Sequence, residues 1–237
     1  MIPKIIHQTY KDIQPFLENS LWLERTNPDW DYRFYDDSAV EDYIASCGRE
    51  IKTAYYSINP EYMAARIDLF RYNLMLEFGG VYLDIKSSIR KPLDDVLRDD
   101  DEYILSHWPI EWEDQRGLRA WGKHSEISNP RGEYQQWHII AQENHPFLEA
   151  VIERVLENIH LANQNHTGRK GVIKTTGPVA YSQAIEPLLM DNVYRLVEMH
   201  ELGLVYTVLN SNIEHYTLFD HYANLTTPLL GNENDNT

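Results

Sequence analysis

Three charged side chains are the strongest candidates for chemistry in this sequence. Asp68 and Arg71 are three residues apart, so on a helix they share one face, and Asp84 follows sixteen residues after Asp68. A carboxylate beside a guanidinium can make paired hydrogen bonds to the vicinal hydroxyls of a sugar. The structural alternative is a surface salt bridge between Asp68 and Arg71, with Asp84 capping the next turn. Spacing alone slightly favours that alternative.

The elements that position these residues form an αβ unit. Residues 60–78 are predicted to be a helix, with Pro60 at its first position and Gly79-Gly80 ending it. Its apolar residues recur every three or four positions: Met63, Ile67, Phe70, Leu74 and Phe78. Residues 81–85 then form a short buried strand. Asp84 therefore lies at a carboxyl strand end, where open α/β sheets bind their ligands.

Further elements are expected along the chain. They are a strand within residues 2–10, a strand within 27–37, a helix over 38–46 capped by Asp37 or Ser38, an acidic loop at 99–102, an irregular insertion over 109–132, helices over 133–142 and 146–161, a loop over 163–171, a helix from the turn at 175–178 through 189, and one or two strands within 193–208. This alternation of strands and helices predicts an α/β protein.

Composition excludes several classes of function. The 237 residues include 21 Lys and Arg against 37 Asp and Glu, a net charge of −16. That charge argues against a nucleic-acid partner and against binding to anionic membranes. The single cysteine, Cys47, excludes a disulfide framework and a Cys-rich zinc site. Because no apolar stretch is long enough to cross a bilayer and no signal-peptide pattern is present, we expect a cytoplasmic protein, at most peripheral at a membrane.

Several ordered motifs together resemble a known family. They are Pro3–Gln8, Asn27–Trp30, Ala64–Tyr72 and Phe78–Asp84, with further similarity at Gln136-Trp137, His145–Leu148, Thr176–Pro178 and near His221. The sequence resembles the glycosyltransferases with a sugar-binding region containing a DXD motif, a family of yeast initiating α-1,6-mannosyltransferases and many bacterial capsule and lipopolysaccharide transferases. It is distantly similar to the glucosylating domains of large clostridial toxins. The match is close over about the first ninety residues.

The resemblance implies a fold, a reaction and a cofactor. The fold is GT-A, a Rossmann-like mixed sheet flanked by helices in one catalytic domain over residues 1–230, followed by a polar tail at 231–237. The nucleotide-sugar half covers about 1–105 and the acceptor half about 106–230. The reaction is a retaining transfer of a hexose from a nucleotide-sugar, UDP-sugar before GDP-mannose, to a glycan or lipid-linked hydroxyl, giving an α-linkage. The expected cofactor is Mn²⁺ or Mg²⁺. A catalytically weak or inactive sugar-binding protein is the alternative.

The resemblance also assigns roles to individual residues. The catalytic group is Asp68, Arg71, Asp84 and Lys86, and the donor-binding set adds His7, Gln8, Thr9 and Arg66. The acceptor-side set is Gln136, Thr176, Gly177 and Pro178, together with Trp108 and Trp112, which are candidates on their own chemistry because Trp rings in a loop-like region can stack on sugar faces. Asp84 and His221 are the candidate metal ligands. Arg169, Lys170 and Lys174 make the most basic stretch, which either receives an anionic acceptor or the diphosphate, or is a solvated turn.

Two positions depart from the family pattern. Lys86 replaces the second Asp of the DXD motif, and Thr227 stands where the family has a Trp. Three interpretations of Lys86 stay open. Its ammonium neutralises the diphosphate in place of a metal, or it swings outward while Asp84 and C-terminal groups hold the metal, or activity is lost. Thr227 keeps the non-catalytic alternative open.

Overall fold

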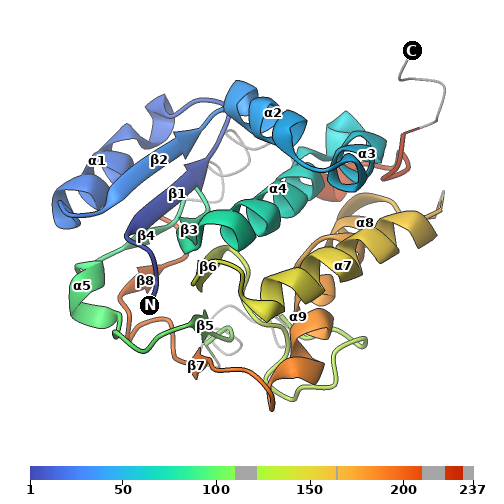
Figure 1. The fold of residues 1–237 in the computed structure, drawn as a ribbon. Helices are drawn as coiled ribbons and strands as arrows, with labels where there is room; N and C mark the ends of the chain where they lie inside the picture. Colours follow the sequence, from blue (N-terminus) through green and yellow to red (C-terminus); the bar gives the residue numbers. More distant parts are fainter. Residues whose placement is uncertain (110–121, 164, 210–221, 232–237) are drawn as a thin grey trace.

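A six-stranded mixed sheet forms the centre of the computed structural model, which describes residues 1–109, 122–163, 165–209 and 222–231. The strand order is β2-β1-β3-β6-β5-β7, and β4 pairs with β8 in a separate ribbon (Figure 1). The strands are β1 (Ile5–Thr9), β2 (Asp31–Tyr35), β3 (Gly80–Leu83), β4 (Ser88–Ile89), β5 (Tyr103–Leu105), β6 (His138–Ala141), β7 (Arg195–Leu196) and β8 (Leu204–Val205). The expected α/β class is confirmed.

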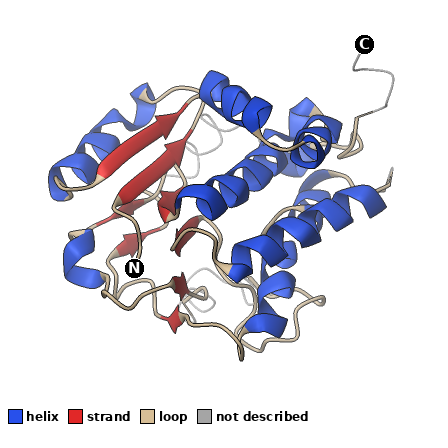
Figure 2. Cartoon of the chain, in the orientation of Figure 1, coloured by secondary structure: helices blue, strands red, loops and turns tan. Residues whose placement is uncertain are grey.

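Helices cover both faces of this sheet (Figure 2). They are α1 (Leu17–Thr26), α2 (Asp37–Ser46), α3 (Arg49–Ser57), α4 (Met63–Phe78), α5 (Leu93–Val96), α7 (Pro146–Leu161), α8 (Gly168–Thr175) and α9 (Pro178–Ile185), with 3₁₀ turns η1 (Gln14–Phe16), η2 (Pro60–Tyr62), η3 (Glu186–Leu188) and η4 (Tyr222–Asn224). Within the described ranges, none of these helices is long and apolar enough to span a bilayer.

Strand residues alternate between two apolar clusters, one on each face of the sheet. Tyr82 and Ile139 pack with residues of α2, α3, α4, α7 and α9, whereas Val81 and Ile140 pack with Leu23 of α1. The strands β2, β1 and β3 run parallel, and β6 lies antiparallel between β3 and β5. The parallel arrangement of β1 and β3 carries the ends of both strands to one edge of the sheet.

The helix α4 is the central element of the site. It is buried on most sides, so the predicted single apolar stripe is only partly right: Met63 is exposed, whereas Asp68 and Arg71 are buried. The helix ends at Gly79, as predicted, where φ is +59°. A Cβ there would lie 2.6 Å from the Glu143 amide nitrogen, so the turn into β3 requires glycine.

Three local predictions are wrong. Residues 133–142 are not a helix but contain β6, an inner strand whose residues are all buried and which fits the two consecutive isoleucines, Ile139 and Ile140. The predicted loop over 163–171 is shorter, because α8 begins at Gly168. The cap of α2 is Asp36, whose side chain accepts a hydrogen bond from the Ala39 amide at 2.8 Å.

Candidate active site

The helix α4 and the end of β3 bring three charged side chains into contact. Arg71 donates to the carboxylate of Asp68 and, from Nη1, to Oδ1 of Asp84 at 2.9 Å. The side chains of Asp68 and Arg71 are 3% and 7% exposed, whereas that of Asp84 is 27% exposed. The three residues therefore share one site. The alternative of a surface salt bridge is wrong, because the pair is buried.

Two residues from distant segments join this cluster. Nε2 of Gln136 lies 3.3 Å from Oδ1 of Asp68, and Oγ1 of Thr176 donates to its Oδ2 at 2.8 Å. The main-chain carbonyl of Gln136 also accepts from Nη1 of Arg71 at 3.2 Å. Gln136 and Thr176, both expected on the acceptor side, thus contact the residue expected on the donor side. We call Asp68, Arg71, Asp84, Gln136 and Thr176 the carboxylate network.

The turn at 175–178 sets the position of Thr176. Pro178 begins α9, and Gly177 packs against α8, where a Cβ would lie 2.8 Å from Cα of Ile173. Gly177 and Pro178 therefore shape the turn that presents the Thr176 hydroxyl. The neighbouring Gln135 points elsewhere, since its Oε1 accepts from Oγ of Ser106 at 2.7 Å.

The two carboxylates of the network differ in what they offer a ligand. Both oxygens of Asp68 are engaged, by Arg71 and Gln136 on one side and by Thr176 on the other. Asp84 is more open to solvent, and its hydrogen bond from Arg71 uses one oxygen. Asp84 is therefore the carboxylate that can accept from a ligand hydroxyl, whereas Asp68 fixes its neighbours.

Three tyrosines surround the network, and sequence reasoning missed them. The Tyr72 hydroxyl donates to the Thr176 carbonyl at 2.9 Å, and the Tyr82 ring lies 5.4 Å from the Arg71 guanidinium. Burial raises the pKa of Tyr72 and of Tyr82, so both stay neutral. Tyr72 is four residues from Asp68, and Tyr82 is two before Asp84, so helical and strand spacing contained this signal. The third is Tyr222. Burial raises the pKa of its phenol, the charge of Arg71 lowers it, and the charge of Asp84 raises it.

Lys86 lies against an aromatic cluster next to Asp84. Its ammonium lies 4.8 Å from the ring centre of Tyr206, a cation–π distance. Tyr206 packs edge-on against Trp108 at 4.9 Å and against Trp137 at 5.6 Å. Nε1 of Trp108 donates to Glu133 at 2.7 Å, which fixes the indole at the border of the cluster. Trp137 is buried.

His7 and Thr9, predicted to bind donor, use their side chains inside the protein. Nε2 of His7 lies 3.0 Å from the Gly79 carbonyl, and its Nδ1 lies 3.1 Å from the Tyr35 hydroxyl. Burial lowers the pKa of His7 to about 4, so the ring is neutral at pH 7. Thr9 donates to the Tyr35 carbonyl at 2.8 Å. Both side chains hold β1 against its neighbours rather than the network.

Gln8 and Arg66 act on the backbone near the network. Nε2 of Gln8 donates to the carbonyl of Asp84 at 3.2 Å, so Gln8 positions the turn that carries Asp84. Arg66 donates twice to the Ile58 carbonyl, at 3.0 and 2.7 Å, and its guanidinium lies 5.0 Å from the Tyr55 ring. These contacts make Arg66 a clamp between α3 and α4.

The described residues do not fit a metal. A divalent ion is common among DXD-containing GT-A enzymes, which hold it with carboxylate oxygens. In the described part of the chain, no three His, Cys, Asp or Glu side chains are placed to hold one together. One carboxylate oxygen of Asp84 already accepts a hydrogen bond from Arg71. Lys86 places an ammonium where the DXD motif has its second carboxylate. His221, the other predicted ligand, and Trp112 lie outside the described residues.

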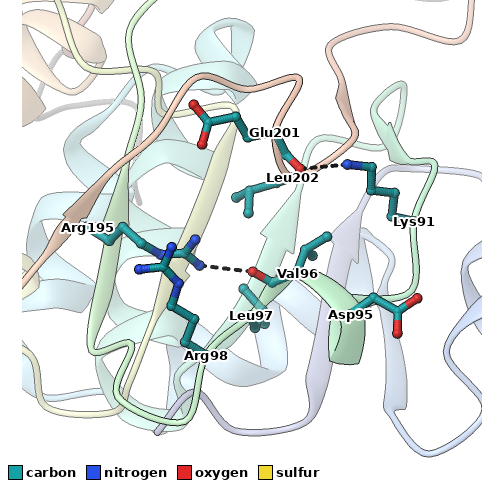
Figure 3. Close-up of a pocket in the computed structure, with 8 residues that line it drawn as sticks. All are labelled: Lys91, Asp95, Val96, Leu97, Arg98, Arg195, Glu201 and Leu202. Carbon is teal, nitrogen blue, oxygen red and sulfur yellow. Dashed lines mark hydrogen bonds between the residues drawn. The ribbon is translucent and has the colours of Figure 1, made fainter.

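A cavity of about 350 Å³ lies near α5 and β7, the strand at one edge of the sheet (Figure 3). It is lined by Lys91, Asp95, Val96, Leu97, Arg98, Arg195, Glu201 and Leu202. None of these residues belongs to the carboxylate network.

Comparison with known sequences points to one family. Residues 16–103 match the family described as glycosyltransferase sugar-binding region containing DXD motif. Inositol phosphoceramide mannosyltransferase 3 of Schizosaccharomyces pombe is 32% identical over 100 residues, which are 40% of this chain and 27% of that protein. The initiation-specific alpha-1,6-mannosyltransferase of the same yeast is 25% identical over 230 residues, which are 85% of this chain and 54% of that protein. The chain thus spans a quarter to a half of these relatives.

Comparison with solved structures establishes the fold. The PaToxG glycosyltransferase superposes with a TM-score of 0.58 at 18% identity, covering 92% of this chain and 76% of that one. The UDP-bound glycosyltransferase domain of the YGT toxin gives a TM-score of 0.54 at 11% identity, covering 87% and 81%. The expected GT-A fold is confirmed. The relatives and structural neighbours named here are all glycosyltransferases.

Proposed function

Because residues 16–103 belong to the family of glycosyltransferase sugar-binding regions containing a DXD motif, we propose that this protein transfers a hexose from a nucleotide-sugar to a hydroxyl group of a glycan or a lipid-linked acceptor. The observation that carries the proposal is the contact of Asp68, Arg71 and Asp84 in one network. The division into a nucleotide-sugar half over 1–105 and an acceptor half over 106–230 remains part of the proposal.

In this proposal, the network binds the donor sugar. Asp84 accepts hydrogen bonds from the hexose hydroxyls, because its carboxylate is the more exposed one. Arg71 donates to the same ligand, and Asp68 is a positioning residue that holds Arg71, Gln136 and Thr176 in place. Binding of hydroxyls that do not react supplies energy to orient the anomeric carbon.

Lys86 serves the leaving group. A diphosphate that leaves gains negative charge, and an ammonium next to it stabilises that charge as a point charge. The position of Lys86 two residues after Asp84, on the Tyr206 ring, supports this role. A Lys in place of the second Asp also removes the carboxylate that would hold a cation there.

The transfer is proposed to retain the anomeric configuration. Asp68 is the other network carboxylate, and both of its oxygens are engaged, so it is poorly placed to attack the anomeric carbon. A front-face attack, in which a phosphate oxygen takes the acceptor proton, needs no such nucleophile. The alpha-1,6 product in the name of one relative supports an α-linkage. Proton NMR of the first product, before it equilibrates, checks the configuration.

The donor is proposed to be GDP-mannose, with UDP-hexose as the second candidate. The mannosyltransferase names of the sequence relatives, at 25–32% identity, favour mannose. The UDP-bound toxin domain favours UDP, as the family resemblance did, but that structure shares only 11% identity with this chain.

A thermal-shift screen of UDP-, GDP- and dTDP-sugars tests the donor, because a bound ligand raises the melting temperature by mass action. Hydrolysis of the stabilising donor is then followed with and without EDTA. Hydrolysis that persists in EDTA supports the Lys86 role, and hydrolysis lost in EDTA supports a metal. Stabilisation without turnover by any donor supports the alternative function, a sugar-binding protein derived from a transferase, which the substitutions Lys86 and Thr227 keep in view.

A further inference from the structure

The turn between β3 and β4 has a main chain that side chains hold in place. Besides the hydrogen bond from Gln8 to the Asp84 carbonyl, Nδ2 of Asn19 on α1 donates to the carbonyls of Ile85 and Ser87, at 3.4 and 2.8 Å. The side chain of Ile85 is buried in the middle of this turn. The charged side chains of the turn therefore extend from a fixed main chain.

The segment after β8 holds the same turn from a second side. The strands β4 and β8 pair antiparallel (Figure 1), and hydrogen bonds continue beyond the ends of the two strands. Oγ of the buried Ser87 donates to the Tyr206 carbonyl at 2.7 Å, and the Val208 amide donates to the Lys86 carbonyl at 2.7 Å. The main chain at Tyr206 therefore keeps a fixed position relative to Lys86.

The ring of Tyr206 is also held in place. Trp108 and Trp137 both pack edge-on with it. Trp137 is buried, and Trp108 lies so close to the backbone of Gly122 that a Cβ there would clash with Cδ1 of the indole. The ammonium of Lys86 lies over this ring, 4.8 Å from its centre. A ring held by its neighbours thus provides the surface on which the lysine lies.

An aromatic ring suits a cation that has to act on an anion. The face of the ring attracts an ammonium within about 6 Å through its quadrupole. The ring carries no net charge, so this contact does not neutralise the ammonium as a carboxylate would. A lysine has a flexible stem, and its rotamer freedom has to be restricted before its charge can act at a defined point. A charge that is already in place needs no reorganisation when negative charge develops next to it.

We propose that Tyr206 is a positioning residue for the transfer reaction, whose ring holds the Lys86 ammonium where the diphosphate departs. This inference rests on the proposed function, in which Lys86 stabilises the leaving group. Tyr206 acts through Lys86 and not on the reacting atoms. The ring carries the role and the phenol hydroxyl does not, because the face of the ring attracts the cation.

A double-mutant cycle tests this assignment, with kcat and KM measured for the donor that the thermal-shift screen identifies. We expect Tyr206→Leu to lower kcat about tenfold, the scale of one cation–π contact shielded from water, and to change KM less. Tyr206→Phe keeps the ring and should recover most of that loss. In a Lys86→Ala background, Tyr206→Leu should cause no further loss, because the charge that the ring positions is already absent.

Tyr194→Leu is the matched control. Tyr194 is half-buried, as Tyr206 is, and its ring packs against Phe147 of α7 at 5.9 Å between ring centres. The control should lower the melting temperature but keep the wild-type kcat. Circular dichroism melting verifies that all variants fold, and Tyr206→Met, which fills a similar space without a ring, replaces Tyr206→Leu if the latter does not.

Four results would overturn the inference while leaving the proposed function in place. They are a wild-type kcat in Tyr206→Leu, an equal loss from this substitution with and without Lys86, an equal loss in Tyr206→Phe, and an equal loss in the Tyr194→Leu control. The second would show that Tyr206 acts independently of Lys86, and the fourth that the loss reflects general destabilisation. A wild-type protein that turns over no donor would instead refute the proposed function, and this inference with it.

Discussion

Two arginine–aspartate clusters, each containing a buried aspartate, lie in different parts of this molecule and have different roles. In the carboxylate network, Arg71 bridges Asp68 and Asp84, which lie on α4 and after β3. At the far edge of the sheet, Arg195 of β7 donates to both oxygens of Asp101, at 2.7 and 2.5 Å. Arg195 also donates to the Val96 carbonyl at 3.0 Å and borders the cavity of Figure 3.

The difference lies in what each pair leaves open. The Asp101 side chain is 3% exposed, and Arg195 engages both of its oxygens, so this pair is closed and ties β7 to the segment before β5. The Asp84 side chain is 27% exposed, and one of its oxygens accepts a hydrogen bond from Arg71, which also pairs with Asp68. The same residue types therefore build a structural tie in one place and, in the proposed function, a ligand-binding surface in the other.

Asp84→Asn should produce the largest loss of turnover. It tests the comparison at the cluster that is open to solvent. The substitution keeps the shape of the side chain but removes the charge that pairs with Arg71 and that we propose binds the sugar hydroxyls. We expect turnover to fall about a thousandfold, the scale of removing one preorganised charged group. Steady-state kinetics with the donor identified by thermal shift measures it, and a loss smaller than tenfold would contradict the assignment of Asp84.

Lys86→Ala should lower turnover by about two to three powers of ten, because the leaving diphosphate loses its point charge. The reduction should appear in kcat more than in KM, since the charge develops on the way to the transition state. Near-normal turnover in this variant would retire the role of Lys86. A return of activity on adding Mn²⁺ to Lys86→Asp would show that the DXD chemistry is latent in the site.

Asp101→Asn sharpens the comparison at its closed end. Removing one partner of a buried pair leaves Arg195 without its counter-charge, so the free energy of unfolding should fall by about 3 kcal/mol. Because the pair lies outside the network, kcat/KM of the folded protein should not change. Urea denaturation measures the first quantity, and a kinetic defect without a stability loss would show that the two regions are coupled.

Acid should lower stability through buried histidines that belong to neither pair. Burial lowers the pKa of His7 to about 4 and that of His138 to about 3, below the ordinary value near 6.5. Below pH 6.5 these histidines are protonated in the unfolded chain but stay neutral in the folded chain. The free energy of unfolding therefore falls between pH 6.5 and 4, by up to about 1.4 kcal/mol per pH unit for each histidine. Urea midpoints across this range give the slope. His7→Gln should remove one histidine's share, and an unchanged slope would refute its part.

Local patterns predicted the strongest elements of the fold. The capped helix before Gly79, the strand before Asp84 and the helix from Pro146 are present as expected. The strand β6 was missed because the residues before it, from Glu133 to Gln136, resemble a helix in composition. Its state depends on pairing with β3 and β5, which lie far away in sequence.

The candidate site was predictable where spacing alone brings residues together. Asp68 and Arg71 lie on one helix face. Tyr72 is about one helical turn from Asp68, and Tyr82 is two residues before Asp84, which is the period of a strand. Asp68 also contacts Gln136 and Thr176, which lie 68 and 108 positions further along the sequence. No local pattern specifies contacts over such separations. The donor-binding role of His7 stays a prediction, because a buried ring at a strand end has the same sequence signature as a ligand-binding one.

A crystal structure with an intact, slowly hydrolysed nucleotide-sugar bound tests the central claim most directly. We predict that the hexose hydroxyls lie within hydrogen-bonding distance of Asp84 and Arg71. A sugar bound elsewhere, for example in the cavity beside Arg195, with Asp84 and Arg71 still closed on each other, would contradict the account.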